Sequence, residues 1–382
     1  MSEYQYYEFQ AIDKRLSDND KQEIKKLSSR VQPTNTTASF FYHHGDFRHD
    51  PYKVLLNYFD AMLYIANWGT HQLMFRFPKG AIPAHIMAQY EFGETVVWTQ
   101  EKEFCVLNIS FDEINNEGMW IEGEGILSEI ISVRDEILTG DYRALYLAWL
   151  ISADYEADRY DIEDDDFEPE DDELAQIIEP PVPNGLQSLS PALKNFTEFF
   201  GLSKDLVSTS AEKSNPLEKL SENLEQYLYK LSDDEKLAFL KRVLAQETRL
   251  DIALTNRLKA FAGENQSVGA TIGGRSILEL LNRAEEIKKQ QLAEKKRKDA
   301  RAHQKKMEQL APQKESLWAR AEALIAQRNV AGYDEAIPIL QDLQALATYQ
   351  NDSSAFNEKI AVIKKTYPTL KGLLDRLKRA NL

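Results

Sequence analysis

The sequence contains a single cysteine, Cys105, among 382 residues. One thiol cannot form an internal disulfide or a multi-cysteine zinc site, so both kinds of cross-link are excluded. Cys105 lies in the apolar run FCVLNI, and we interpret it as a core residue rather than a nucleophile. A serine in a GxSxG turn is also missing, which leaves acyl transfer without support.

Long hydrophobic runs are missing as well. No window approaches the roughly 18 unbroken apolar residues that a membrane-spanning helix needs. The N-terminus, MSEYQYYEFQAID, has neither a basic n-region nor an apolar h-region, so we predict no secretory signal. We therefore expect a cytoplasmic protein without a membrane segment, long enough for two or three domains.

Charge is distributed unevenly along the chain, whose net charge is -16. Residues 1–153 carry 13 Lys and Arg against 22 Asp and Glu, and residues 154–173 carry one Arg against 13 acids. The remaining 32 bases and 27 acids make residues 174–382 mildly basic. Because so many acids cannot be buried together, we predict that residues 154–173 are solvated and form a linker that ends in the spacer PPVPNG at 180–185.

The first half has the pattern of an α+β domain. Strands are predicted at 4–12, 36–42 and 71–77, with a hairpin over 95–111 that turns near 100–103. Ser17 and Asp50 are typical helix caps, and the helix after Asp50 is predicted to run to Gly69. Further helices are expected at 83–90, 127–138 and 142–151. The result is a small, mostly antiparallel sheet with covering helices.

The second half is predicted to be entirely helical. Leucines recur at helical spacing over 217–231, and Ser232 with Glu235 is predicted to form a capping box for the helix that follows. Residues 276–310 contain neither Gly nor Pro, which favours one long helix with an apolar face at its start and almost none over 288–306. The tract YDEAIPILQDLQALA resembles one hairpin of the tetratricopeptide type, without a sustained repeat. We expect five parts, namely an α+β domain at 1–153, a linker at 154–185, a helical domain at 186–274, the long helix at 275–310 and a helical hairpin at 311–382.

Three sequence patterns resemble ligand sites, but the residues of each favour a different interpretation. GATIGGRS at 269–276 has P-loop spacing, but Arg275 replaces the lysine and helix rather than strand precedes it. Residues 161–172 are rich in acids but lack the glycine of a calcium loop. His43, His44, Asp46 and His49 have the side chains that bind zinc, yet no spacing places them on one rigid face, and an exposed polar loop is favoured.

The basic tract at 283–306 is the strongest candidate for a contact surface. It carries ten bases against four acids, but no aromatic residue for base stacking. A solvated or protein-docking helix is favoured over a nucleic-acid contact, and the acidic segment 161–173 is a possible internal counterpart. The residues predicted to contact a partner or polyanion are Lys295, Lys296, Arg297, Lys298, Arg301, Lys305 and Lys306.

MSEYQYYEFQAID, DPYKVLLNYFDAMLYIANWGTHQLMFRFP and the EPPVP spacer are similar to a family of uncharacterised bacterial proteins. The resemblance implies a bacterial, intracellular, full-length protein of two parts, and it implies no activity or catalytic residue. We predict a non-enzymatic protein-interaction or scaffold protein with no cofactor. The alternatives are a nucleic-acid-associated accessory protein that uses 283–306 and a metal-dependent enzyme with a site at 43–50.

Overall fold

The computed structural model describes residues 4–112, 114, 123–162, 171–217, 224–245, 249–262 and 271–382. The chain forms two compact units, Met1–Ile287 and Lys288–Leu382. Apolar side chains from the sheet, from residues 186–206, from Ile252 and from the start of the long helix share one core. For this reason the first unit extends across the domain boundaries expected from the sequence.

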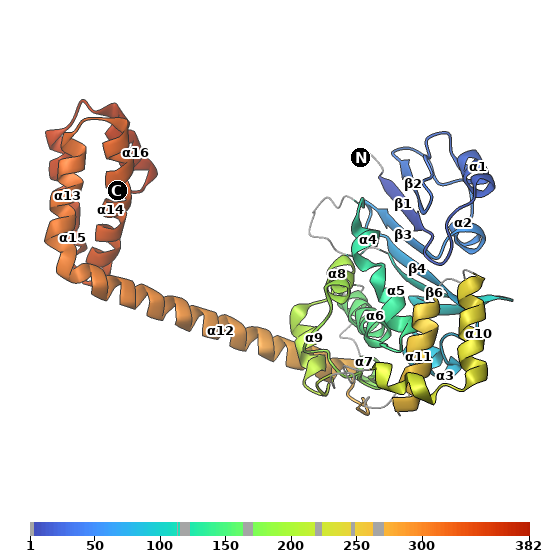
Figure 1. The fold of residues 1–382 in the computed structure, drawn as a ribbon. Helices are drawn as coiled ribbons and strands as arrows, with labels where there is room; N and C mark the ends of the chain where they lie inside the picture. The colour runs from blue at the N-terminus through green and yellow to red at the C-terminus, as the bar shows by residue number, and fades with distance from the viewer. Residues whose placement is uncertain are drawn as a thin grey trace. The chain divides into compact units, whose positions relative to one another are not determined.

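Unit 1 is built on a six-stranded sheet in which every strand pairs antiparallel with its neighbours (Figure 1), as predicted. The strand order is β2-β1-β3-β4-β6-β5. The tight β5–β6 hairpin turns over residues 101–103, as the sequence indicated. The strands are β1 (Gln5–Gln10), β2 (Thr37–Tyr42), β3 (Ala61–Ala66), β4 (His71–Pro78), β5 (Val96–Gln100) and β6 (Phe104–Phe111).

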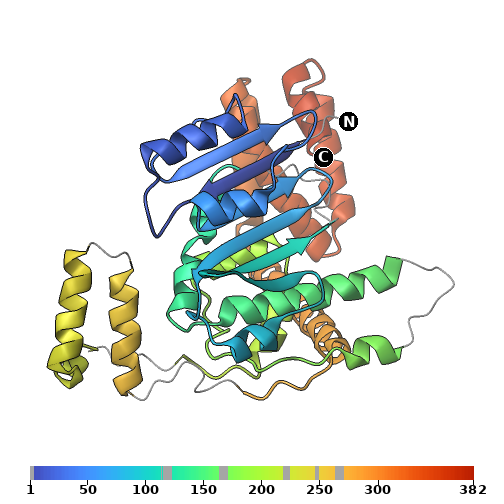
Figure 2. The same cartoon turned by 90° about the vertical axis from the view of Figure 1, so that its right-hand side faces the viewer.

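Helices cover both faces of this sheet, so the strands alternate between two cores (Figure 2). In β3, Leu63 enters the larger core, whereas Met62 and Tyr64 enter the smaller one. The smaller core is closed by α1 (Asp18–Leu27) and α2 (Pro51–Tyr58). The larger core is closed by α3 (Ala84–Tyr90), α4 (Ile126–Ile130), α5 (Ser132–Leu138), α6 (Arg143–Ile162) and α8 (Pro191–Phe199).

The predicted helix over 50–69 is wrong beyond Tyr58. Helix α2 ends there, and residues 61–66 form β3, all of whose residues are buried. A strand buried on both faces is apolar throughout, so it lacks the alternation that distinguishes a strand from a buried helix. The predicted start is confirmed, because the Asp50 side chain accepts from Tyr52 N and Pro51 is the first residue of α2.

The linker predicted to begin at Asp154 is also corrected. Helix α6 continues to Ile162 because Ala153 and Ala157 are buried one turn apart. Helix α7 (Asp171–Gln176) follows, and residues 163–170, which carry six of the 13 acids of residues 154–173, lie outside the described residues. Val182 is buried in the spacer and pairs with Thr271. The spacer is therefore part of the body of unit 1.

The remaining helices of unit 1 follow the spacer in sequence. Ser232 and Glu235 form the predicted capping box of α10. Where a helix was expected from the leucine spacing near 217–231, the described residues form the 3-10 helix η1 (Leu224–Lys230). The α-helices here are α9 (Lys204–Ala211), α10 (Asp233–Leu244) and α11 (Leu250–Ala262).

The long charged helix is confirmed as α12 (Ile277–Leu310), followed by the short 3-10 helix η2 (Ala311–Gln313). Ile277 and Leu280 are fully buried in the core of unit 1. Every residue from 288 to 306 is exposed, and Met307 is buried again. None of the described helices is both long enough and apolar enough to cross a membrane.

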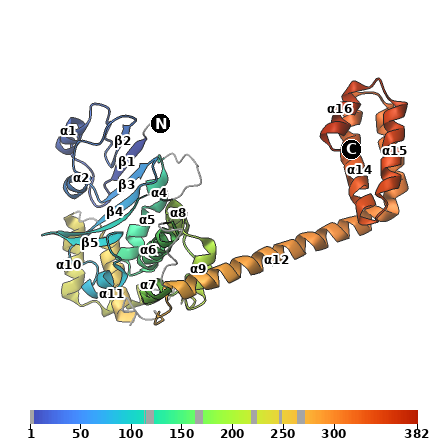
Figure 3. The ribbon, with the colours of Figure 1, turned by 180° about the vertical axis from the view of Figure 1, so that it is seen from behind.

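Unit 2 contains a helical bundle in which α13 (Lys314–Ala326) and α14 (Val330–Tyr349) form a hairpin. The tract YDEAIPILQDLQALA, residues 333–347, lies within α14 alone and does not form a hairpin by itself. Helices α15 (Ser353–Thr366) and α16 (Lys371–Arg379) pack against α14 (Figure 3). The core of the bundle includes Trp318, Leu340 and Phe356. Unit 2 therefore has its own apolar core, separate from the cores of unit 1.

Candidate functional site

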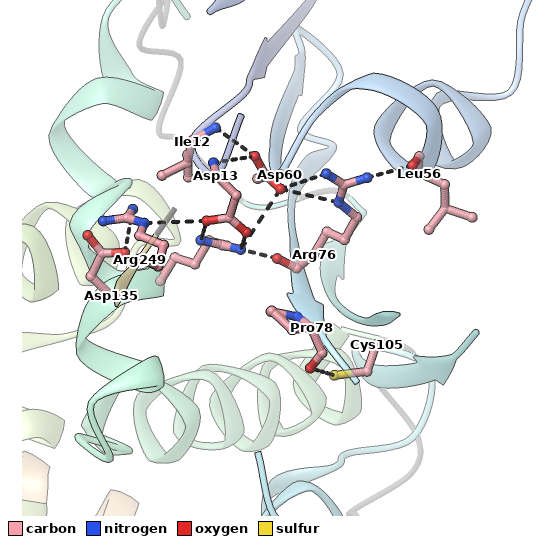
Figure 4. A network of polar contacts seen from close by, with 10 residues as sticks. Ile12, Asp13, Leu56, Asp60, Arg76, Pro78, Cys105, Asp135 and Arg249 are labelled. Atoms are coloured by element: carbon pink, nitrogen blue, oxygen red, sulfur yellow. Dashed lines mark hydrogen bonds and ion pairs between the residues drawn. The ribbon is translucent and has the colours of Figure 1, made fainter. Parts of the chain in front are cut away.

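Charged side chains form a buried network between the sheet and α5 (Figure 4). Asp60 lies at the start of β3, and its Oδ2 accepts hydrogen bonds from Ile12 N at 2.6 Å and Asp13 N at 2.9 Å. Its Oδ1 accepts from Arg76 Nη2 at 2.7 Å. The Asp60 carboxylate therefore joins the end of β1 to β4 across the beginning of β3.

Arg134 of α5 lies at the centre of the network and is fully buried. Its Nη1 and Nη2 donate to the two carboxylate oxygens of Asp13 at 2.9 and 2.6 Å, and its Nε donates to Arg76 O at 2.8 Å. This bidentate geometry is the strongest form of an arginine–carboxylate pair. Arg249, from the segment before α11, adds contacts to Asp13 at 3.3 Å and to Asp135 at 2.7 Å.

The arginines of the network neutralise its carboxylates, and their hydrogen bonds fix the positions of these side chains. Burial would raise the pKa of Asp13, but the hydrogen bonds and charge of Arg134, with those of Arg249, outweigh burial and lower that pKa. Burial raises the pKa of Asp135, with Arg249 opposing the shift. Because the three arginines engage the three carboxylates, we assign the network a structural role. These residues were not predicted from the sequence, although the charge of Arg76 inside the apolar strand HQLMFRF was a signal.

Arg275 of the P-loop-like segment belongs to a second buried cluster of charged side chains. Arg275 donates from Nη2 to Glu179 Oε1 at 2.6 Å and from Nε to Oε2 at 2.9 Å. The Tyr146 hydroxyl donates to the same Oε1 at 2.6 Å. A side chain at Gly273 would collide with the carbonyl oxygens of Glu179 and Pro180. The glycine therefore permits two chain segments to approach closely, and Arg275 is engaged with protein groups.

The histidine loop is exposed and its members have separate neighbours. Asp46 Oδ1 accepts from Gln5 Nε2 at 2.8 Å. His43 lies against Phe41, and His49 lies 5.7 Å from Phe47 between ring centroids. His44 is exposed. Within the described ranges, no group of three or more His, Cys, Asp and Glu side chains is placed to hold a metal ion.

The basic tract lies on the exposed part of α12, and only some of its charges are paired. Lys298 contacts Glu294 at 2.8 Å, and Lys306 contacts Asp342 at 2.6 Å. Arg283, at the start of the tract, contacts Glu212 at 2.7 Å and Glu286 at 2.9 Å. Among the described residues, no ion-pair partner is found for the following side chains: Lys295, Lys296, Arg297, Arg301 and Lys305.

The predicted pairing of the acidic segment with this tract stays a prediction. Most of residues 161–173 lie outside the described residues. The acidic partners described for the tract lie outside that segment: Arg283 contacts Glu212 and Glu286, Lys298 contacts Glu294, and Lys306 contacts Asp342.

The stability of unit 1 is predicted to fall at alkaline pH because burial raises the pKa of several of its tyrosines. Burial raises the pKa of Tyr52 and of Tyr142 to about 12. Burial, followed by the charge of Glu179, also raises the pKa of Tyr146 well above its ordinary value. A raised pKa stabilises the fold below the unfolded pKa of about 10, and this contribution is lost as the pH rises through the folded pKa.

Absorbance at 295 nm during a pH titration is the measurement for this prediction. We expect Tyr52 and Tyr142 to ionise only at about pH 12 or on unfolding, well above the pKa of about 10 of an unperturbed tyrosine. Circular dichroism on the same samples distinguishes ionisation within the fold from unfolding. A single ionisation step for all tyrosines near pH 10, with the fold intact, would contradict it.

Comparison with known proteins adds no identification. No family model, no curated protein and no solved structure matches the chain.

Proposed function

We propose that this chain is a non-enzymatic interaction protein, and that the exposed cationic part of α12, residues 288–306, binds an acidic surface of a partner protein. One observation carries the proposal. Residues 288–306 are exposed throughout and contain nine Lys and Arg against two acids. They have no apolar stripe with which to pack on their own chain.

The sequence of this part of α12 sustains a helix without burial. Ala, Lys, Glu, Gln and Arg, which dominate it, have high helix propensities. Glu294 precedes Lys298 by four residues, the more favourable orientation of such a pair. The buried residues Leu280 and Met307 anchor the helix on either side of the exposed part. A preformed helix loses little conformational entropy on binding, which favours its use as a contact surface.

A partner protein is favoured over nucleic acid because the chain as a whole is strongly acidic, with a net charge of -16. Such a charge repels a polyanion at long range. Residues 288–306 also contain no Phe, Tyr or Trp on which a base would stack. Electrostatic complementarity with an acidic protein surface requires neither a net positive charge of the whole chain nor aromatic residues for stacking.

The test replaces five unpaired cations of α12 with glutamine, at Lys295, Lys296, Arg297, Arg301 and Lys305. A photo-crosslinking residue at Ala302 reports the partner in cell extract with and without nuclease. We expect a protein cross-link that survives nuclease and falls at least about tenfold in the five-site variant, because each lost contact weakens the complex.

The control variant carries the same charge change at exposed cations elsewhere. Glutamine replaces Lys25, Arg30, Lys365, Lys371 and Arg379, all of them exposed. This control should keep the cross-link, since net charge is then matched and only the location differs. Loss of the cross-link in both variants, or its absence in the unmodified chain, would overturn the proposal.

Nucleic-acid binding is the second candidate, favoured by one feature of the same helix. Arg297, Arg301 and Lys305 are spaced four residues apart, so they lie along one side of α12. Three phosphate contacts predict a slope of about -3 in a plot of log affinity against log salt for duplex DNA. Such a slope, reduced in the five-site variant but not in its control, would favour this candidate over a partner protein.

A further inference from the structure

Helix α10 carries an apolar face that no described residue covers. Leu237, Leu240, Val243 and Leu244 are 50, 61, 56 and 84% exposed, and α10 contains no buried residue. The three leucines are spaced three and four residues apart, which places them along one side of the helix. Such a stripe is typical of a helix that packs against another helix.

The opposite side of α10 contacts α11. Glu235 pairs with Arg257 of α11 at 2.7 Å. At about 100° per residue, Leu244 lies on the side of α10 opposite Glu235. Helix α11 is held to the body of unit 1, because Asn256 Nδ2 donates to Leu138 O at 2.8 Å and Lys259 Nζ to Thr139 O at 2.9 Å. The apolar stripe therefore faces away from α11, which lies beside α10 (Figure 1).

Charge along α10 changes sign from one end to the other. Asp233 and Asp234 lie in its first turn, and Lys241 and Arg242 lie in its last turn. Asp234 and Lys241 are exposed, and the described residues provide neither with an ion-pair partner. They are separated by two helical turns, so both flank the leucine stripe on the same side.

We propose that the stripe is a self-association surface, on which α10 of a second copy of this chain packs antiparallel about a two-fold axis. An antiparallel pair brings the acidic first turn of each helix beside the basic last turn of the other. A two-fold interface is self-complementary, so one apolar stripe with opposite charges at its two ends satisfies both partners. A parallel pair would instead place like charges side by side.

The size of the surface predicts a weak dimer. Stable interfaces bury about 800 Å² per partner, and one face of a 12-residue helix provides less. We therefore expect the monomer at low concentration and a dimer with a dissociation constant on the order of 10 µM or higher. Sedimentation-equilibrium ultracentrifugation of the full chain over a range of concentrations measures this constant.

Two sets of variants test the surface. Leu240→Lys should raise the dissociation constant by at least about tenfold, because it places charge in the apolar seam. Val362→Lys is the matched control, since Val362 of α15 is 62% exposed against 61% for Leu240. Asp234→Lys and Lys241→Asp should each weaken the dimer, and the two changes together should restore it.

Recovery of the dimer in the variant with both charge exchanges distinguishes a lost contact from a destabilised helix, which a second substitution would not repair. Circular dichroism on each variant checks that its helix content is retained. A chain that stays monomeric up to hundreds of micromolar would overturn the proposal. So would a dimer that Leu240→Lys leaves unchanged, or one whose paired charge exchange is no better than either single change.

Discussion

Replacing Arg134 with methionine is expected to lower the free energy of unfolding of unit 1 by about 3–5 kcal/mol, the usual cost of removing one partner from a buried ion pair. Arg134 is fully buried and holds both carboxylate oxygens of Asp13. Methionine keeps much of the volume but leaves Asp13 without its closest cation. The hydrogen bond to Arg76 O is lost as well.

Hydrogen exchange resolved by peptide is the appropriate measurement, because the chain has two units and one global transition would mix them. Amides of β3 and β4 should exchange faster in the variant, while those of α14 in unit 2 should not change. Arg48→Met is the matched control at an exposed arginine of unit 1, expected to change stability by less than about 0.5 kcal/mol. Equal protection of β3 and β4 in both variants would show that the buried network contributes little.

Replacing Glu179 with alanine is expected to cost about 3 kcal/mol or more, for a related reason. The Arg275 side chain is 14% exposed, and Glu179 is its carboxylate partner. The change also removes the acceptor of the Tyr146 hydroxyl. We expect the loss to appear in both α6 and the segment around residues 271–277, because Glu179 lies between them.

A double-mutant cycle separates the pair from its surroundings. Arg275→Met alone leaves the Glu179 carboxylate buried without its cation, and should cost about as much as the loss of Glu179. Glu179→Ala combined with Arg275→Met should cost less than the sum of the two single changes, because no unpaired charge is then buried. Additive single changes in hydrogen exchange of α6 would contradict a coupled pair.

Local patterns in the sequence were sufficient for much of the fold. Ser17, Asp50 and Ser232 were predicted as helix caps, and each side chain accepts a backbone hydrogen bond at the start of its helix. The β5–β6 hairpin was predicted with its turn. These features depend on residues close together in the chain, so the local sequence contains the information needed to predict them.

Of the two exposed surfaces, the sequence predicted the charged part of α12 but not the leucine stripe of α10. The absence of an apolar stripe over 288–306 indicated a solvated helix, and this part of α12 is exposed. The leucine stripe of α10 gave no such indication, because an amphipathic helix is ordinarily expected to bury its apolar face. Whether a neighbouring element covers that face depends on packing, and α11 occupies the other side of α10.

Sequence patterns alone were sufficient to predict the α+β first half, the helical second half, the long charged helix and the helix caps Ser17, Asp50 and Ser232. The tertiary structure decided that residues 61–66 are a central strand, that α6 continues to Ile162, and that Glu179 meets Arg275. The physical reason is separation along the chain. Burial of β3 on both faces and the pairing of residues 96 positions apart depend on contacts that no local pattern encodes.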